Sequence, residues 1–209
     1  MSKNKKKKQK RKGSIMGRSD IPFAQRLKIQ KNQDIAVNRE HAAKIAMMCM
    51  SCAMHEEEGI GYKRLTRFSL EFHENIEEFY EDVQLGLAHA KRRMEQIGMP
   101  ISGELYAVNI VDKDDVQNHA AHAIQVALIV GTITANDHFG FGKDRLERIL
   151  LKTREHTARY AKEGEGFLLE KVQKLGFPII DGRITAFMDD DGNPVVASRA
   201  IKEGYLDGK

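Results

Sequence analysis

Tryptophan is absent from the 209-residue sequence, the other aromatic residues are sparse, and there are only two cysteines. Cys49 and Cys52 are too few for a disulfide framework, which favours a reducing, cytoplasmic location. No apolar run approaches the ~18 residues that a membrane-spanning helix needs, and no apolar stretch follows the basic N-terminus as it would in a secretory signal. We therefore expect no membrane partner.

The sequence also lacks the short motifs that accompany common catalytic and cofactor sites. It contains no nucleophile elbow, no phosphate-binding P-loop and no dinucleotide fingerprint. The acidic run at residues 189–191 does not fit a calcium loop, because Gly192 follows too early. We therefore expect a protein that is not an enzyme and that carries no cofactor.

Positive charge is concentrated at the N-terminus. Residues 1–35 contain 12 Lys or Arg and two Asp, a net charge of +10, whereas the remainder contains 22 basic and 28 acidic residues, a net charge of −6. A block of like charge repels itself and cannot bury enough apolar surface to fold alone, so we expect residues 1–19 to form a disordered arm. Three interpretations of the arm are open: a solubilising tail, a nucleic-acid-binding arm or, in a eukaryote, a nuclear localisation signal. Its main basic residues are Lys3, Lys5, Lys6, Lys7, Lys8, Lys10, Arg11 and Lys12.

A segment with two glycines occurs twice in the chain. Residues 59–65 (GIGYKRL) return 81 positions later as residues 140–146 (GFGKDRL). The same shift relates His41 to His122, Ala42 to Ala123, Ala46 to Ala127 and Arg67 to Arg148. Further on, residues 97–101 (IGMPI) correspond to 175–179 (LGFPI), and 103–107 (GELYA) to 182–186 (GRITA). Self-similarity over this length predicts a tandem duplication.

Each copy shows the same order of three helices. The first helix covers about residues 38–55 and 118–136, and the Gly-x-Gly turn ends it because glycine tolerates the left-handed conformation of a C-cap. Its apolar positions are Ala42, Ile45, Ala46, Cys49 and Cys52, and in the second copy Ala123, Val126, Ala127, Val130 and Ile133. The second helix carries Leu65, Phe68, Phe72, Ile76 and Phe79, matched by Leu146, Ile149, Leu150 and Tyr160. The third carries Val83, Leu87, Met94 and Ile97, matched by Phe167, Leu168, Val172 and Leu175, and Gly98 or Gly176 caps it.

A strand closes each copy, at about residues 105–111 and 183–188, and a turn at 189–194 predicts a hairpin between the second strand and residues 195–196. We expect a mainly α fold with minor β structure, in which two helix-helix-helix-strand units surround a pseudo-two-fold axis. Their strands pair in a small sheet, because a lone strand leaves backbone groups unpaired. The predicted segments are an arm (1–19), a short helix at about 22–34 with a linker (20–36), the two repeats (37–116 and 117–196) and a tail (197–209).

The segments 59–68 (GIGYKRLTRF) and 140–149 (GFGKDRLERI) resemble the helix-hairpin-helix family, whose turn has the form G-φ-G-x-x-x-A-x-x-φ. In that family two motifs often pair, and backbone amides at the start of the second helix hold a DNA phosphate without reading its sequence. The resemblance implies a phosphate site at Gly59, Gly61, Lys63 and Arg64, and a second one at Gly140, Gly142, Lys143 and Arg145. The alternative interpretation is that these glycines are ordinary helix C-caps, and the carboxylates at 56–58 would weaken a phosphate site.

A second resemblance is to small helical proteins of Gram-positive bacteria and their phages, based on the lysine-rich start and the G-aromatic-G-x-x-R-L turn at 140–146. This class implies no particular activity. The recurring arginines (64 with 145, and 67 with 148) fit either a clamp on phosphate or carboxylate groups or ion pairs with nearby acids such as Glu71 or Glu147.

Cys49, Cys52 and His55 have a spacing that metal ligands use, but a fourth ligand is not evident, and His119 or His122 would have to supply it. The counterparts of the two cysteines are Val130 and Ile133, which favours a core position for both. Since His122 matches His41, we expect these two histidines to share a packing or capping role. We expect no bound metal.

These patterns lead to two hypotheses. The first is a non-enzymatic accessory protein that contacts the backbone of DNA or RNA through its basic arm and its two Gly-x-Gly hairpins. The second is a protein-interaction module, an adapter or inhibitor of possible phage origin, whose acidic body binds a nucleic-acid-handling partner. The oligomeric state, the preference for DNA or RNA and the source organism do not follow from the sequence.

Overall fold

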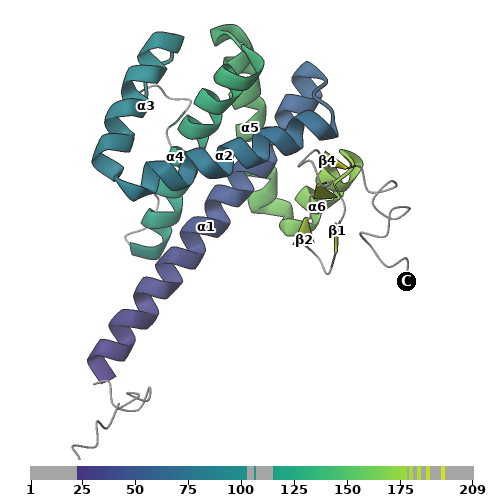
Figure 1. The fold of residues 1–209 in the computed structure, drawn as a ribbon. Coiled ribbons are helices and arrows are strands. Elements are labelled where there is room, and N and C mark those ends of the chain that lie inside the picture. The colour runs from purple at the N-terminus through teal and green to yellow at the C-terminus, as the bar shows by residue number, and fades with distance from the viewer. Residues whose placement is uncertain are drawn as a thin grey trace, which may run out of the picture.

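The computed structural model describes residues 23–102, 106 and 115–177, together with the pairs 179–180, 183–184, 187–188 and 194–195. The described part is mainly helical, as expected (Figure 1). Its helices are α1 (Phe23–Glu58), α2 (Tyr62–Glu81), α3 (Val83–Ile97), α4 (Asp115–Phe139), α5 (Lys143–Glu163) and α6 (Glu165–Lys174). The predicted arm at 1–19 and the tail at 197–209 lie outside the described residues.

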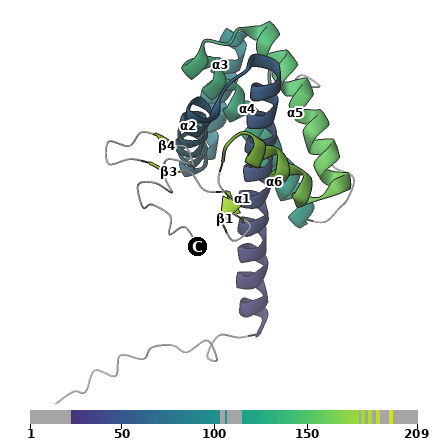
Figure 2. The same cartoon turned by 90° about the vertical axis from the view of Figure 1, so that its right-hand side faces the viewer.

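Helix α1 is a single helix of 36 residues, so the predicted interruption between a short helix and the first helix of the repeat is wrong. No glycine or proline occurs between Phe23 and Glu58, and the Asn38 side chain donates a hydrogen bond of 2.7 Å to the Asp34 carbonyl within the helix. The N-terminal half of α1 projects away from the other helices (Figures 1 and 2). Val37, on this half, is 65% exposed.

The two helices that precede the Gly-x-Gly turns form the centre of the body. Helix α1 packs most extensively on α4, and next on α5, while α2 packs on α4 (Figure 2). Where α1 meets α4 the helices approach closely, because a Cβ atom at Gly131 would lie only 2.6 Å from Met50 Sδ. Helix α1 is thus flanked by α5, which follows the second turn, and α4 is flanked by α2, which follows the first turn.

Most predicted apolar positions of these helices are buried, while Ile133 of α4 and Tyr160 of α5 are partly buried. Phe68 and Leu65 of α2 and Leu146 and Ile149 of α5 are completely buried, as are most of the small residues on α1 and α4. Helix α3 differs from the prediction in its first half: Ala90 and Met94 are buried, but Val83 and Leu87 are 43% and 50% exposed. These four residues share one helical face, and neighbouring helices cover only its second half.

Glycines end the helices where expected. Gly59 and Gly140 have φ angles of 66° and 64°, and their N–H groups donate to the carbonyls of His55 and Asn136, each at 2.9 Å. Left-handed backbone of this kind is strained for residues with a Cβ atom, so glycine is the natural residue at the end of both helices. Helix α3 ends at Gly98 in the same conformation.

The structure describes four two-residue strands in the C-terminal part of the chain. β1 (Ile179–Ile180) pairs with β2 (Arg183–Ile184), and β3 (Phe187–Met188) pairs with β4 (Pro194–Val195), both in antiparallel register. β2 and β3 lie within the segment predicted as one strand, and β4 overlaps the predicted hairpin partner. The predicted partner strand at 105–111 lies outside the described residues, except for Tyr106, which is buried. Among the described helices, none is long and apolar enough to cross a membrane.

Candidate nucleic-acid interface

The two Gly-x-Gly turns, residues 59–61 and 140–142, lie close together at the C-terminal ends of α1 and α4, and we call them the paired turns. Arg145, just after the second turn, has its Nε atom 3.6 Å from Glu58 Oε2, just before the first. Arg64, just after the first turn, has its guanidinium carbon 4.7 Å from the centre of the Phe139 ring, just before the second. The side chains at the two turns therefore meet at a shared surface.

Both turns are held by the same kind of contact. Ile60 and Phe141, the central residues, are buried. The His55 ring lies with Nδ1 3.0 Å from the Ile60 carbonyl oxygen, and the Asn136 amide donates to the Phe141 carbonyl at 2.9 Å. A side chain from the last turn of the preceding helix therefore anchors each loop, which fixes the direction in which the next helix begins.

Helices α2 and α5 both start without a side-chain cap. Gly61 and Gly142 are the N-cap residues, with extended backbone (φ −84° and −75°), and neither can supply a side-chain acceptor. The N-terminus of a helix carries partial positive charge and attracts anions. Asp144 places a carboxylate in the first turn of α5, whereas the first turn of α2 contains no acidic residue. The first of the paired turns is therefore the more favourable place for an anion.

The basic side chains around the second turn are already neutralised. Arg148 donates to Glu58 at 2.8 Å and lies 4.0 Å from Glu57, while Lys143 lies 3.7 Å from Glu147. The ion-pair interpretation of the two arginines of α5 is thus confirmed, but the expected partners were wrong. Glu147 pairs with Lys143 instead, and Glu71 lies 3.4 Å from His138. The acids that meet the arginines come from the end of α1.

Within the described residues, the basic side chains around the first turn have no such partners. Lys63, Arg64 and Arg67 are exposed on α2. Among the described residues, no carboxylate lies within ion-pair distance of any of the three; Arg64 instead lies over the Phe139 ring. A cation over an aromatic ring keeps its full charge and its hydrogen-bond donors available.

Glu56 joins three helices in a way that the sequence did not suggest. It accepts a hydrogen bond from Lys171 of α6 and lies 3.1 Å from His156 Nε2 and 3.9 Å from Lys152 Nζ, both on α5. Burial raises the pKa of Glu56, but the Lys171 hydrogen bond and the nearby positive charges outweigh burial, so the pKa is lowered. Burial lowers the pKa of His156, which the Glu56 carboxylate opposes only in part. Since the partners are about a hundred residues apart, no local spacing could have predicted this cluster.

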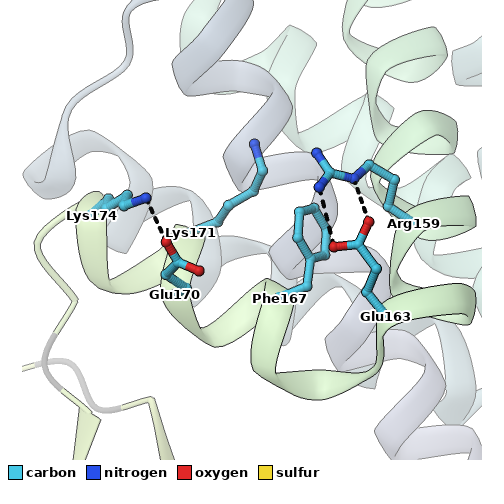
Figure 3. Close-up of a pocket in the computed structure, with 6 residues that line it drawn as sticks. All are labelled: Arg159, Glu163, Phe167, Glu170, Lys171 and Lys174. Atoms are coloured by element: carbon cyan, nitrogen blue, oxygen red, sulfur yellow. Dashed lines mark hydrogen bonds and ion pairs between the residues drawn. The ribbon is translucent and has the colours of Figure 1, made fainter.

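A shallow pocket of about 380 Å³ lies between the end of α5 and α6 (Figure 3). Arg159 donates to Glu163 at 2.9 and 3.1 Å and lies 4.3 Å from the centre of the Phe167 ring. Lys174 donates to Glu170 at 2.7 Å (Figure 3). With Lys171 paired to Glu56, each of the three lining cations has a carboxylate partner. The pocket therefore offers no unneutralised positive charge to an anion.

The cysteines occupy the core, as their counterparts in the second copy indicated. Cys49 and Cys52 are 0% and 1% exposed, and burial raises their thiol pKa values to about 11 and about 12. The His55 ring contacts the Ile60 carbonyl oxygen in the first Gly-x-Gly turn. In the part of the chain that the structure describes, no group of three or more His, Cys, Asp or Glu side chains is placed to hold a metal ion.

The two matched histidines lie on α1 and α4. His41 Nε2 lies 3.4 Å from the Tyr160 hydroxyl of α5. His122 lies near Arg39 and His119, and burial and both these groups lower its pKa. A packing contact therefore exists for His41, while the predicted shared role stays a prediction.

The predicted site residues thus divide into two groups. The structure brings together Gly59, Gly61, Lys63 and Arg64 with Gly140, Gly142, Lys143 and Arg145 at the paired turns. The basic residues of the arm, Lys3 to Lys12, lie outside the described residues. A scan against protein-family models and searches of curated proteins and of solved structures found no significant match to this chain.

Proposed function

We propose that this chain is a non-enzymatic accessory protein that binds the backbone of a nucleic acid. The observation that carries the proposal is the position of the paired turns: two helix N-termini without a side-chain cap at one end of the body, with basic side chains beside the first that have no carboxylate partner in the described part of the chain. Backbone amides and arginines of this kind hold phosphates without reading bases. The basic arm, with its sequence-independent charge, supplies the remainder of the affinity.

The test is direct titration of a fluorescein-labelled duplex of about 20 base pairs, and of a single strand and an RNA of equal length, over a series of salt concentrations. Backbone binding predicts that log K falls linearly with log salt, with a slope of about −0.9 per phosphate contact on duplex DNA. Deletion of residues 1–19 is expected to remove most of the affinity. Binding that does not change with salt, or no binding to any of the three probes, would reject the proposal.

We also propose that the chain is a tandem duplication of a helix-helix-helix-strand unit with a pseudo-two-fold axis and a small sheet. Equivalent contacts support it. A Cβ at Gly98, the end of α3, would lie 3.8 Å from Lys143, the first residue of α5. A Cβ at Gly176, just after α6, would lie 3.6 Å from Tyr62, the first residue of α2. Met50 and Gly131, which meet where α1 crosses α4, are themselves 81 positions apart.

The second candidate function, a protein-interaction module, is favoured by a different surface. The C-terminal half of α2 carries four exposed glutamates, Glu74, Glu77, Glu78 and Glu81. The first turns of α3 follow directly, with Leu85 and Leu87 68% and 50% exposed. Exposed leucines beside acidic side chains suit a partner with a basic, partly apolar surface.

This second candidate is tested by affinity capture from nuclease-treated extract, comparing the full chain with the L85Q/L87Q variant. A protein recovered by the full chain and lost with the variant would support it. Equal recovery by both chains, or no recovery by either, would count against it. Circular dichroism of the variant establishes that the helical fold is kept, which is expected because both leucines are at least half exposed.

A further inference from the structure

The two halves differ at the positions that face the arginines. Glu57 and Glu58 end α1, and 81 positions later His138 and Phe139 end α4. Arg145 and Arg148 therefore lie 3.6 Å and 2.8 Å from the Glu58 carboxylate, and Arg148 lies 4.0 Å from Glu57. Arg64 instead lies 4.7 Å from the centre of an aromatic ring. Arg64 and Arg145 occupy equivalent sequence positions, and the facing residues Phe139 and Glu58 are also equivalent, but their chemistry is different.

Glu58 is well placed to hold its arginines. Its side chain is only 11% exposed, whereas Arg145 and Arg148 are 56% and 51% exposed. A carboxylate and a phosphate each offer a pair of oxygens that accept charge-assisted hydrogen bonds from a guanidinium group, so they compete for the same arginine. A phosphate that approaches the second turn must therefore displace a carboxylate that is part of the chain, and Asp144 in the first turn of α5 adds further repulsion.

The first turn lacks each of these obstacles. His138, which is equivalent to Glu57, lies 3.4 Å from Glu71 of α2. Arg67 lies one helical turn before Glu71 on the same helix and has no carboxylate partner among the described residues. Lys63 and Arg64 are likewise exposed and unpaired with acids in the described part. The Phe139 ring supports the Arg64 guanidinium and does not neutralise it.

We propose that the paired turns have different tasks: the first holds the phosphate backbone through Arg64 and Arg67, and the second is occupied by Glu57 and Glu58, which act as an intramolecular competitor for phosphate. This inference rests on the proposed nucleic-acid binding and names the residues that limit it. Because the competitor belongs to the chain, it weakens phosphate contacts at the second turn at every protein concentration. Binding then depends on the arm and one turn, which keeps the affinity moderate and sensitive to salt.

The experiment uses matched variants of the full chain at equivalent positions, titrated against the same labelled duplex over a salt series. The R64A/R67A variant is expected to reduce the slope of log K against log salt by about 1.8, at about 0.9 for each lost phosphate contact. The R145A/R148A variant is expected to change the slope by less than about 0.5, because those arginines contact carboxylates and not phosphate. Thermal melting of each variant establishes that the fold is kept.

Three further variants change the carboxylates near the paired turns. E57Q/E58Q keeps the shape of both side chains and removes their charge, so it is expected to increase the slope by up to about 1.8 and to tighten binding. Adding R145A/R148A to E57Q/E58Q is expected to abolish that gain, which assigns it to the two arginines. H138E places a carboxylate at the position equivalent to Glu57 and is expected to weaken binding.

Equal losses for the two arginine pairs, or no gain with E57Q/E58Q, would overturn the division of tasks while leaving the proposed function in place. Binding by H138E as tight as that of the unaltered chain would likewise overturn the division of tasks and leave the proposed function in place. Absence of binding by the unaltered chain would overturn the proposed function and this inference with it. The two failures are therefore distinguishable in one set of titrations.

Discussion

Replacing Gly86 with alanine tests how closely α2 and α3 approach at their corner. A Cβ atom at Gly86 would lie 2.8 Å from the carbonyl oxygen of Phe79, 3.0 Å from its ring and 3.1 Å from its Cα. Two of these atoms belong to the backbone, so the overlap cannot be relieved by a side-chain rotation alone. Overpacking of this kind costs about 1–3 kcal/mol, while alanine in a helix gains about 1 kcal/mol over glycine. We therefore expect G86A to be less stable by about 1 kcal/mol.

The control is G166A, because Gly166 lies in the first turn of α6 and a Cβ there would have no neighbouring atom within 4 Å. Alanine at that position is expected to stabilise by roughly 0.5–1 kcal/mol. For a chain of this size each kcal/mol shifts Tm by about 2–4 °C, so circular dichroism melting separates the two variants. If G86A melts at or above the temperature of the unaltered chain while G166A is stabilised, the close approach of the two helices is refuted.

Three further predictions concern stability and reactivity. The pKa of His156 is lowered from 6.5 by burial, so the stability that neutral His156 contributes is complete above pH 6.5 and is lost as the pH falls toward the lowered pKa of the folded chain. Urea titrations of H156Q are expected to show a smaller loss of stability between pH 7 and pH 5 than those of the unaltered chain. An equal loss of stability in both chains would contradict this. Gly59 and Gly140 have left-handed backbone with open space around them, so alanine at either is expected to cost about 1–2 kcal/mol in a melting experiment, and a neutral result would argue against the conformation. Because burial raises the pKa of Cys49 and Cys52 to about 11 and about 12, both thiols are expected to react with iodoacetamide only on unfolding, and rapid labelling of the native chain would disprove their burial.

The sequence predicted the features that depend on local patterns. Apolar residues at helical spacing identified the buried faces of α2 and α5, and the duplicated glycines identified the ends of α1 and α4. These signals work because burial and left-handed backbone each constrain residue type over a few positions. The position of the paired turns beside each other followed only from the structure.

Two kinds of feature could not be predicted in this way. The Arg148–Glu58 pair joins residues 90 positions apart, so local spacing could not predict it. The expected partners, Glu71 and Glu147, instead contact His138 and Lys143. Val83 and Leu87 continue the apolar face of Ala90 and Met94, but whether a face is buried depends on how far the neighbouring helices extend. In both cases the decisive partner lies on another element.

The unbroken run of α1 has a mechanical consequence. Ala42 is the first residue of α1 described as buried, although Arg39 already lies over the Tyr80 ring, and at about 1.5 Å per residue the stretch from Phe23 to His41 measures about 27 Å. The start of α1 therefore lies about this far from the buried part of the helix, a distance equal to roughly eight stacked base pairs at about 3.4 Å each. Under the proposed function, a nucleic acid that reaches both the start of α1 and the paired turns must be long as well as charged, so short oligonucleotides are expected to engage one end at a time and to forgo the gain from tethering.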